Sequence, residues 1–183
     1  MIKILYQKVY SDVVIIALLF MMSIPGYSNT IKVFTLDDIR LSYFRAVLNP
    51  AVAPYLLEEL EALDSGSPTI QAYIGATQAL LAVLTSNPFA QIKHLRKSVN
   101  TLESAVDQES NNPEIRFLRF AVQSNIPRFL GLSREMRQDK AIVLQNLMAL
   151  NGFHPDVKSF IKMWLKESGV YSQEEVKIIE ASI

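Results

Sequence analysis

NPFAQIKHLRKSVNTLESAVDQ, residues 87–108, has the pattern of one long amphipathic helix. Asn87 followed by Pro88 is typical of a helix start, because asparagine caps free N–H groups and proline fits the first helical position. The apolar residues of this stretch recur at spacings of three and four, and are Ile92, Leu95, Val99, Leu102 and Val106. Such spacing places them on one side of a helix, so the stretch must bury this stripe against other helices.

The same punctuation by proline, glycine and capping residues continues on both sides of this helix. It predicts helices at 36–48, 54–63, 67–84, 113–126, 134–150 and 155–168, and a last helix from Ser172 onward. Thr35 with Asp38, and Ser172 with Glu175, have the spacing of capping boxes. The connectors are short, so we expect a single all-helical domain at 29–183, built from seven or eight antiparallel helices. The stretch 30–34 is too short and isolated to build a sheet.

The helix predicted at 67–84 carries small residues on one face. They are Ala72, Gly75, Ala76 and Ala79. Glycine inside a soluble helix costs about 1 kcal/mol relative to alanine, so it usually has a packing reason. We therefore expect a neighbouring helix to approach this face closely.

The N-terminal residues have the pattern of a secretory signal. Lys3 and Lys8 precede the apolar run 13–24, and Pro25-Gly26 then breaks the helix. Small residues follow, which places the expected cleavage before Asn29 and a signal peptide at 1–28. The run is shorter than the roughly 20 residues of a membrane-spanning helix. We expect an exported protein, periplasmic or secreted, and the alternative is a protein tethered by an uncleaved N-terminal segment.

The composition excludes several classes of function. Lys plus Arg equals Asp plus Glu, at 18 each, so no overall charge attracts nucleic acid or an anionic membrane. We expect membrane contact only if the N-terminal segment is retained. The chain has no cysteine, which excludes a disulfide scaffold, a thiol nucleophile, a cysteine-ligated metal and a lipid-anchored bacterial N-terminus.

The middle third of the chain resembles tetratricopeptide repeats. Ser98, Leu102 and Ala105, followed by a polar turn and the helix start PEIRFLRFAV at 113–122, are similar to the second helix of one repeat and the first of the next. Tyr73 with Gly75 is similar to a first helix. The helices at 67–84 and 87–108 are longer than the 34-residue period allows, and no second copy recurs at a fixed period. The resemblance implies a tetratricopeptide-like, α-solenoid-type array that binds another protein on a concave surface.

The residues that could support catalysis or metal binding are few. His94 and His154 are the two histidines, and neither stands in a metal-ligand or catalytic motif. The carboxylates cluster at Glu58, Glu59, Glu61 and Asp64, on what reads as a solvated helix surface. We therefore expect no catalytic residue, no metal and no cofactor.

Arginines around the helices at 113–126 and 134–150 form the most suggestive polar group. The candidate interaction surface consists of Arg116, Arg119, Arg128 and Arg137. If the helices pack together, these guanidinium groups can converge on a groove and hold an anionic group or an acidic partner. The plainer alternative is that Arg116 and Arg119 pair with carboxylates of their own chain, at Glu114, Glu135 or Asp139.

Three functions follow from these patterns. The first is a non-enzymatic protein-interaction module, with a partner in the cell envelope. The alternative is a small-molecule or lipid-binding helical protein whose apolar cavity is lined by Phe117, Phe120, Phe129 and Trp164. An enzyme of an unfamiliar type comes third, because it requires a pocket of convergent ionisable groups.

Overall fold

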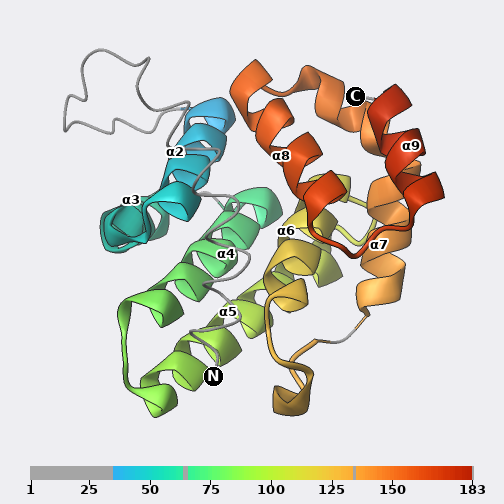
Figure 1. Ribbon diagram of the computed structural model, residues 1–183. Helices are drawn as coiled ribbons and strands as arrows, with labels where there is room; N and C mark the ends of the chain where they lie inside the picture. Colours follow the sequence, from blue (N-terminus) through green and yellow to red (C-terminus); the bar gives the residue numbers. More distant parts are fainter. Residues whose placement is uncertain (1–34, 64–65, 134, 183) are drawn as a thin grey trace.

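The computed structural model describes residues 35–63, 66–133 and 135–182, and within these ranges every regular element is helical (Figure 1). The predicted signal peptide at 1–28 and the stretch 30–34 lie outside the described residues. The α-helices are α2 (Leu36–Leu48), α3 (Ala53–Ala62), α4 (Pro68–Leu84), α5 (Pro88–Gln108), α6 (Pro113–Ser124), α7 (Met136–Gln145), α8 (Pro155–Glu167) and α9 (Gln173–Ser182). Short 3-10 helices are η1 (Pro50–Val52), η2 (Arg128–Leu130) and η3 (Leu147–Gly152). The predicted all-helical fold class is thus confirmed for this part of the chain.

Helices α2, α4, α5, α6 and α9 begin where the capping residues predict. Thr35 and Asp38 form the expected box: the Asp38 N–H donates to Thr35 Oγ1 over 3.2 Å, and the Thr35 N–H donates to the Asp38 carboxylate over 3.1 Å. At α9, the Ser172 N–H donates to Glu175 Oε2 over 2.7 Å. Side chains of Ser67, Asn87 and Asn112 accept N–H groups at the starts of α4, α5 and α6. These caps satisfy N–H groups that have no partner inside the helix.

Helices α4 and α5 form a close antiparallel hairpin. Gln71 donates to Ser104 Oγ and Thr101 donates to Gln78 Oε1, so later residues of α4 meet earlier residues of α5. A Cβ atom added to Gly75 would lie 2.8 Å from Leu102 Cγ, closer than real Cβ contacts. The predicted close approach at the small-residue face is therefore confirmed, and its partner is α5.

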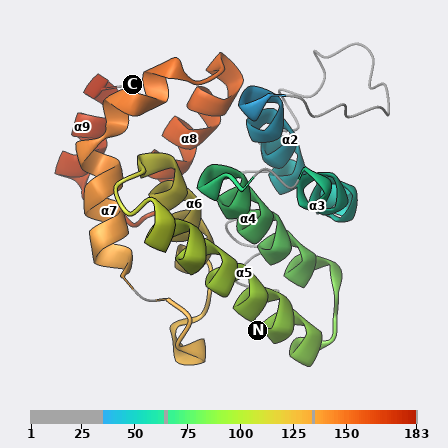
Figure 2. The ribbon, with the colours of Figure 1, turned by 180° about the vertical axis from the view of Figure 1, so that it is seen from behind.

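The other helices pack around this hairpin. Helix α6 lies against α4, α5 and α7, and α2 lies against α4 (Figures 1 and 2). Helix α2 also contacts α8, far away in the sequence, where the rings of Phe44 and Phe160 lie 4.5 Å apart. Consecutive helices α7 and α8 do not pack closely, although short connectors favour neighbours. Helix α9 instead packs against both α8 and η3.

The helix predicted at 134–150 is shorter in the structure. It begins at Met136, after Glu135 in a left-handed conformation with φ 55°, and Ser133 donates to the Gln123 carbonyl instead of capping it. It ends at Gln145, where the side chain of Asn146 donates to the Ile142 carbonyl over 2.8 Å. Such a local bond competes with continuation of the helix, and η3 follows.

Candidate functional site

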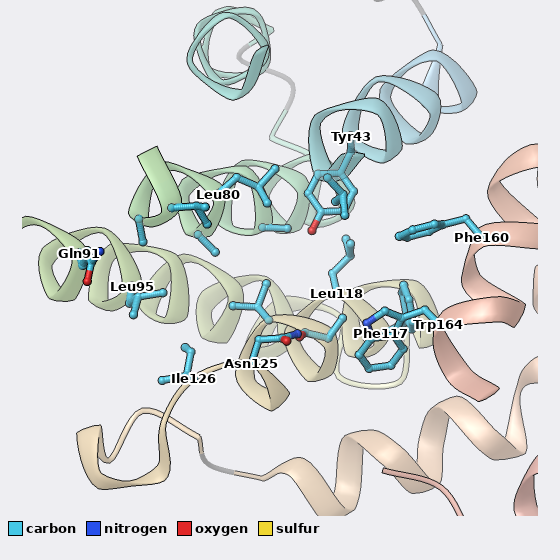
Figure 3. A pocket seen from close by; sticks show the side chains of 17 residues that line it. Tyr43, Leu80, Gln91, Leu95, Phe117, Leu118, Asn125, Ile126, Phe160 and Trp164 are labelled. Atoms are coloured by element: carbon cyan, nitrogen blue, oxygen red, sulfur yellow. The ribbon is translucent and has the colours of Figure 1, made fainter. Parts of the chain in front are cut away.

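A groove of about 360 Å³ lies between α2, α4, α5, α6 and α8 (Figure 3). Most of its lining is aliphatic or aromatic, and includes Tyr43, Leu80, Leu95, Leu118, Ile126 and Phe160. No side chain that lines it carries a formal charge. Its volume is within the roughly 300–1,000 Å³ typical of small-ligand sites, and such sites are mostly apolar.

Small residues of α4 leave room for this groove. Helix α4 has no charged residue along its length, which is typical of a helix covered on several sides. Gly75 faces α5, whereas Ala76 and Ala79 line the groove. The small-residue face therefore has two effects. It allows α5 to approach closely, and its short side chains leave space in the groove.

Trp164 stands at the α8 side of the groove. Its ring is held edge-to-face by Phe117 at 5.4 Å and by Phe120 at 5.8 Å, a preferred geometry for aromatic pairs. The indole nitrogen points into the groove in Figure 3, and no hydrogen bond joins it to another described residue. The groove thus presents the indole N–H as a donor on a wall that is mainly apolar.

The amides that line the groove are already hydrogen-bonded. Gln91 donates to the Thr85 carbonyl over 2.8 Å, and Asn125 donates to the Ala121 carbonyl over 2.8 Å. Gln91 keeps a second N–H, and the side-chain oxygens of both amides accept no hydrogen bond from a described residue. The groove is therefore mainly apolar with a few polar groups along its lining.

A buried ion cluster beside the groove joins α2, α4 and α6. Arg40 donates to both oxygens of Glu114, over 2.8 and 2.7 Å, and the Tyr73 hydroxyl donates to Glu114 over 2.8 Å. Burial would lower the pKa of Arg40, but hydrogen bonds and the charge of Glu114 outweigh it and raise that pKa. Burial first, and then the Glu114 charge, raise the pKa of Tyr73 well above its usual value. Arg40 also lies 4.0 Å from the ring centre of Phe153.

Arg116 and Arg119, two of the four predicted interaction residues, are buried. They are 4% and 5% exposed, and Asp139 between them is 0% exposed. Arg116 Nη1 lies 2.7 Å from Asp139 Oδ1, and Arg119 donates to both Asp139 oxygens over 2.7 Å. Arg116 and Arg119 therefore pair with a carboxylate of their own chain, which was the alternative to an interaction surface. These ion pairs join α6 to α7.

Arg128 and Arg137, the other two, both line a separate hollow beside α7. Both are exposed, and the hollow is also lined by Phe120, Met136 and Val170. Lys140 lines it too and pairs with Glu175 over 2.8 Å. The hydrogen bond from Lys140 is the largest cause of the lowered pKa of Glu175. The structure thus divides the predicted arginine surface into a buried pair and an accessible pair.

The predicted aromatic cavity is partly assembled. Phe117 and Trp164 line the groove, whereas Phe120 is buried behind Trp164 and Phe129 is 76% exposed. Tyr43, Leu80 and other groove residues were not predicted from the sequence. The absence of charge throughout 68–84 is the signal that could have indicated the groove residues of α4, such as Leu80.

Two of the other polar candidates, His154 and Glu61, have contacts within the chain. His154 caps α8, where its Nδ1 accepts the Asp156 N–H over 3.3 Å. Glu61 lies 3.4 Å from Lys97, with both side chains exposed. Within residues 35–63, 66–133 and 135–182, no group of three or more histidines and carboxylates could hold a metal ion.

Comparison with known proteins gives no match to a family model, to a curated protein or to a solved structure. No helix in the described part of the chain has the length and hydropathy to cross a membrane. We therefore infer a function from the groove and from the ion clusters around it.

Proposed function

We propose that this protein is a non-enzymatic binding protein that holds a small, mainly apolar ligand in the groove beside Trp164. The observation that carries this proposal is the uncharged lining of a cavity of about 360 Å³. Water occupies about 30 Å³ per molecule in the liquid, so the groove accommodates roughly twelve groups of water or methylene size. An acyl chain of that length, with an oxygen that accepts the Trp164 N–H, fits both features.

The test uses Trp164 as the reporter, because it is the only tryptophan in the chain. Dodecanoate is titrated into the full-length protein, and tryptophan emission is recorded. We expect a saturable shift of the emission, since a ligand in the groove displaces water from one side of the indole. An emission spectrum that does not change over the soluble range of dodecanoate would contradict the proposal.

A matched pair of variants separates groove binding from adsorption elsewhere. Ala79→Phe places a ring inside the groove, whereas Ala141→Phe places the same ring on the exposed surface of α7. We expect the first variant to lose the fluorescence response and the second to keep it. Both must unfold near the parent temperature, and an equal response from the two variants would place the ligand outside the groove.

A protein-interaction module is the second candidate, and the hollow beside α7 favours it. Arg128 and Arg137 are both exposed there, beside apolar side chains that an acidic partner segment could cover. The α4–α5 hairpin is compatible with a tetratricopeptide-like array. The contact between α2 and α8 differs from an open solenoid, in which each repeat contacts its neighbours only.

Crosslinking in the native host tests this second candidate, with the tagged parent beside an Arg128→Ser/Arg137→Ser variant. Arg116 and Arg119 stay unchanged, because their loss would disturb the fold. A partner captured by the parent and lost from the folded variant would support the module. Equal capture by both proteins would remove the hollow as the interaction surface.

A further inference from the structure

The charges of this chain balance overall but are unevenly distributed. No Asp or Glu occurs between Asp64 and Glu103, or between Glu114 and Glu135. These two acid-free stretches contain the α4–α5 turn, the first half of α5 and all of η2. A balanced composition therefore conceals a region whose charged residues are all basic.

Basic and aromatic side chains of this region are exposed to solvent. Phe89, in the first turn of α5, is 83% exposed, and Phe129, in η2, is 76% exposed. Lys93, Arg96 and Arg128 are exposed beside them. Phe89 and Phe129 are the two most exposed large apolar side chains of the described residues, and their place among basic residues indicates an interaction surface.

The two acid-free segments reach the same end of the molecule. Figures 1 and 2, which view the ribbon from opposite sides, both place the α4–α5 turn and η2 at the lower end. Gln91 of α5 and Ile126, just before η2, also line the groove. The end that carries the exposed phenylalanines therefore adjoins the groove.

We infer that this end of the molecule docks on an anionic membrane surface. Phe89 and Phe129 insert at the boundary of headgroups and acyl chains, and Lys93, Arg96 and Arg128 lie over the anionic headgroups. Aromatic and basic side chains on one face are the combination that interfacial membrane binding requires. The two exposed rings stand on separate segments, an arrangement that suits a deformable lipid surface. The inference does not depend on the proposed ligand in the groove.

This surface differs from the expectation that only a retained N-terminal segment would bring the chain to a membrane. That expectation used the net charge, which is zero. Electrostatic attraction acts over about 10 Å at moderate salt, so the charges around the docking end determine binding and the net charge does not. These charges include Glu61, which pairs with Lys97, and Glu135, which lines the same hollow as Arg128.

Vesicle sedimentation with the full-length chain tests the inference. Vesicles of phosphatidylcholine are compared with vesicles of equal parts phosphatidylcholine and phosphatidylglycerol. Lys93→Gln/Arg96→Gln/Arg128→Gln is expected to weaken partitioning to the anionic vesicles by about fivefold per charge, roughly a hundredfold together. Phe89→Ser/Phe129→Ser is expected to weaken it by at least about tenfold. Added salt should weaken binding of the parent.

Matched variants elsewhere on the surface provide the controls. Arg45→Gln/Lys166→Gln/Lys177→Gln removes three exposed cations from other helices, and Tyr55→Ser removes an aromatic side chain that is 72% exposed on α3. These variants should bind like the parent. All proteins share one N-terminus, so any contribution of 1–28 is common to them.

The outcomes separate clearly. Loss of binding at the docking end with no loss in the controls supports the inference. Docking-end variants that partition like the parent, or controls that lose as much as they do, would overturn it. Binding to immobilised polyglutamate with none to either vesicle would also overturn it, in favour of an acidic macromolecule. A variant whose response to dodecanoate changes while its vesicle binding stays normal would test the ligand proposed in the groove and not the docking end.

Discussion

Replacement of Asp139 by asparagine should strongly destabilise the protein. The Asp139 carboxylate is 0% exposed and accepts three hydrogen bonds of 2.7 Å from Arg116 and Arg119. Asparagine has nearly the same shape but no charge, and only one of its side-chain atoms can accept a hydrogen bond. The variant would therefore leave two guanidinium groups buried without a counter-charge.

The expected loss is about 3–5 kcal/mol, which is the usual cost of removing one partner from a buried ion pair. Solvent cannot screen much of this cost, because the two arginines are 4% and 5% exposed. A domain of this size typically has about 5–15 kcal/mol of stability in total. Asp139→Asn should thus remove a large part of the unfolding free energy of the protein.

Urea unfolding followed by far-ultraviolet circular dichroism measures this loss, provided that the slope with urea stays constant. Arg128→Ser, on an exposed cation, is the control and should change stability by less than about 0.5 kcal/mol. Replacement of all three members of the cluster by Leu and Met should recover much of the loss, since it leaves no buried charge. If the unfolding free energy of Asp139→Asn lies within about 1 kcal/mol of that of the parent, Asp139 does not hold the two buried arginines as we describe.

Two further predictions concern the α4 helix. Gly75→Ala should destabilise by up to about 2 kcal/mol, because crowding against Leu102 exceeds the gain in helix propensity, and Gly75→Leu should cost several kcal/mol. Gly152→Ala, which would meet no atom within 4 Å, should melt like the parent, and equal melting of both alanine variants would contradict the close contact. The raised pKa of Tyr73 means that its neutral form stabilises the fold below pH about 10 and that this contribution is lost as pH rises further. Tyr73→Phe should therefore reduce the fall in unfolding free energy above pH 10 by up to about 1.4 kcal/mol per pH unit, and an unchanged slope would refute this origin.

Local patterns of the sequence predict most helix boundaries correctly. The cap of Thr35 with Asp38 and the proline starts of α4, α5 and α6 depend on neighbours within one turn, so the sequence alone contains the information. The close contact at Gly75 was also predictable, because a glycine inside a helix indicates a nearby backbone. These features require no knowledge of which helices meet.

The features that depend on distant residues were not predictable in the same way. Sequence spacing places Arg116 and Arg119 on one face but does not show whether that face meets solvent or Asp139. Spacing likewise does not specify the early end of α7 or the bond from the Asn146 side chain to the Ile142 carbonyl. The groove, in turn, requires α8 to come back to α2, and no local pattern specifies that contact.

The buried ion clusters and the groove are connected through α6. At its start, Glu114 binds Arg40 of α2, and two residues later Arg116 begins the contact with α7. Phe117 and Leu118, the next two residues, form part of the groove wall. Because one helix carries both sets of contacts, we expect a shift at either ion cluster to change the groove wall beside Trp164. The arginines that first suggested a binding surface would then affect the proposed binding indirectly, because they hold the helix that shapes the groove.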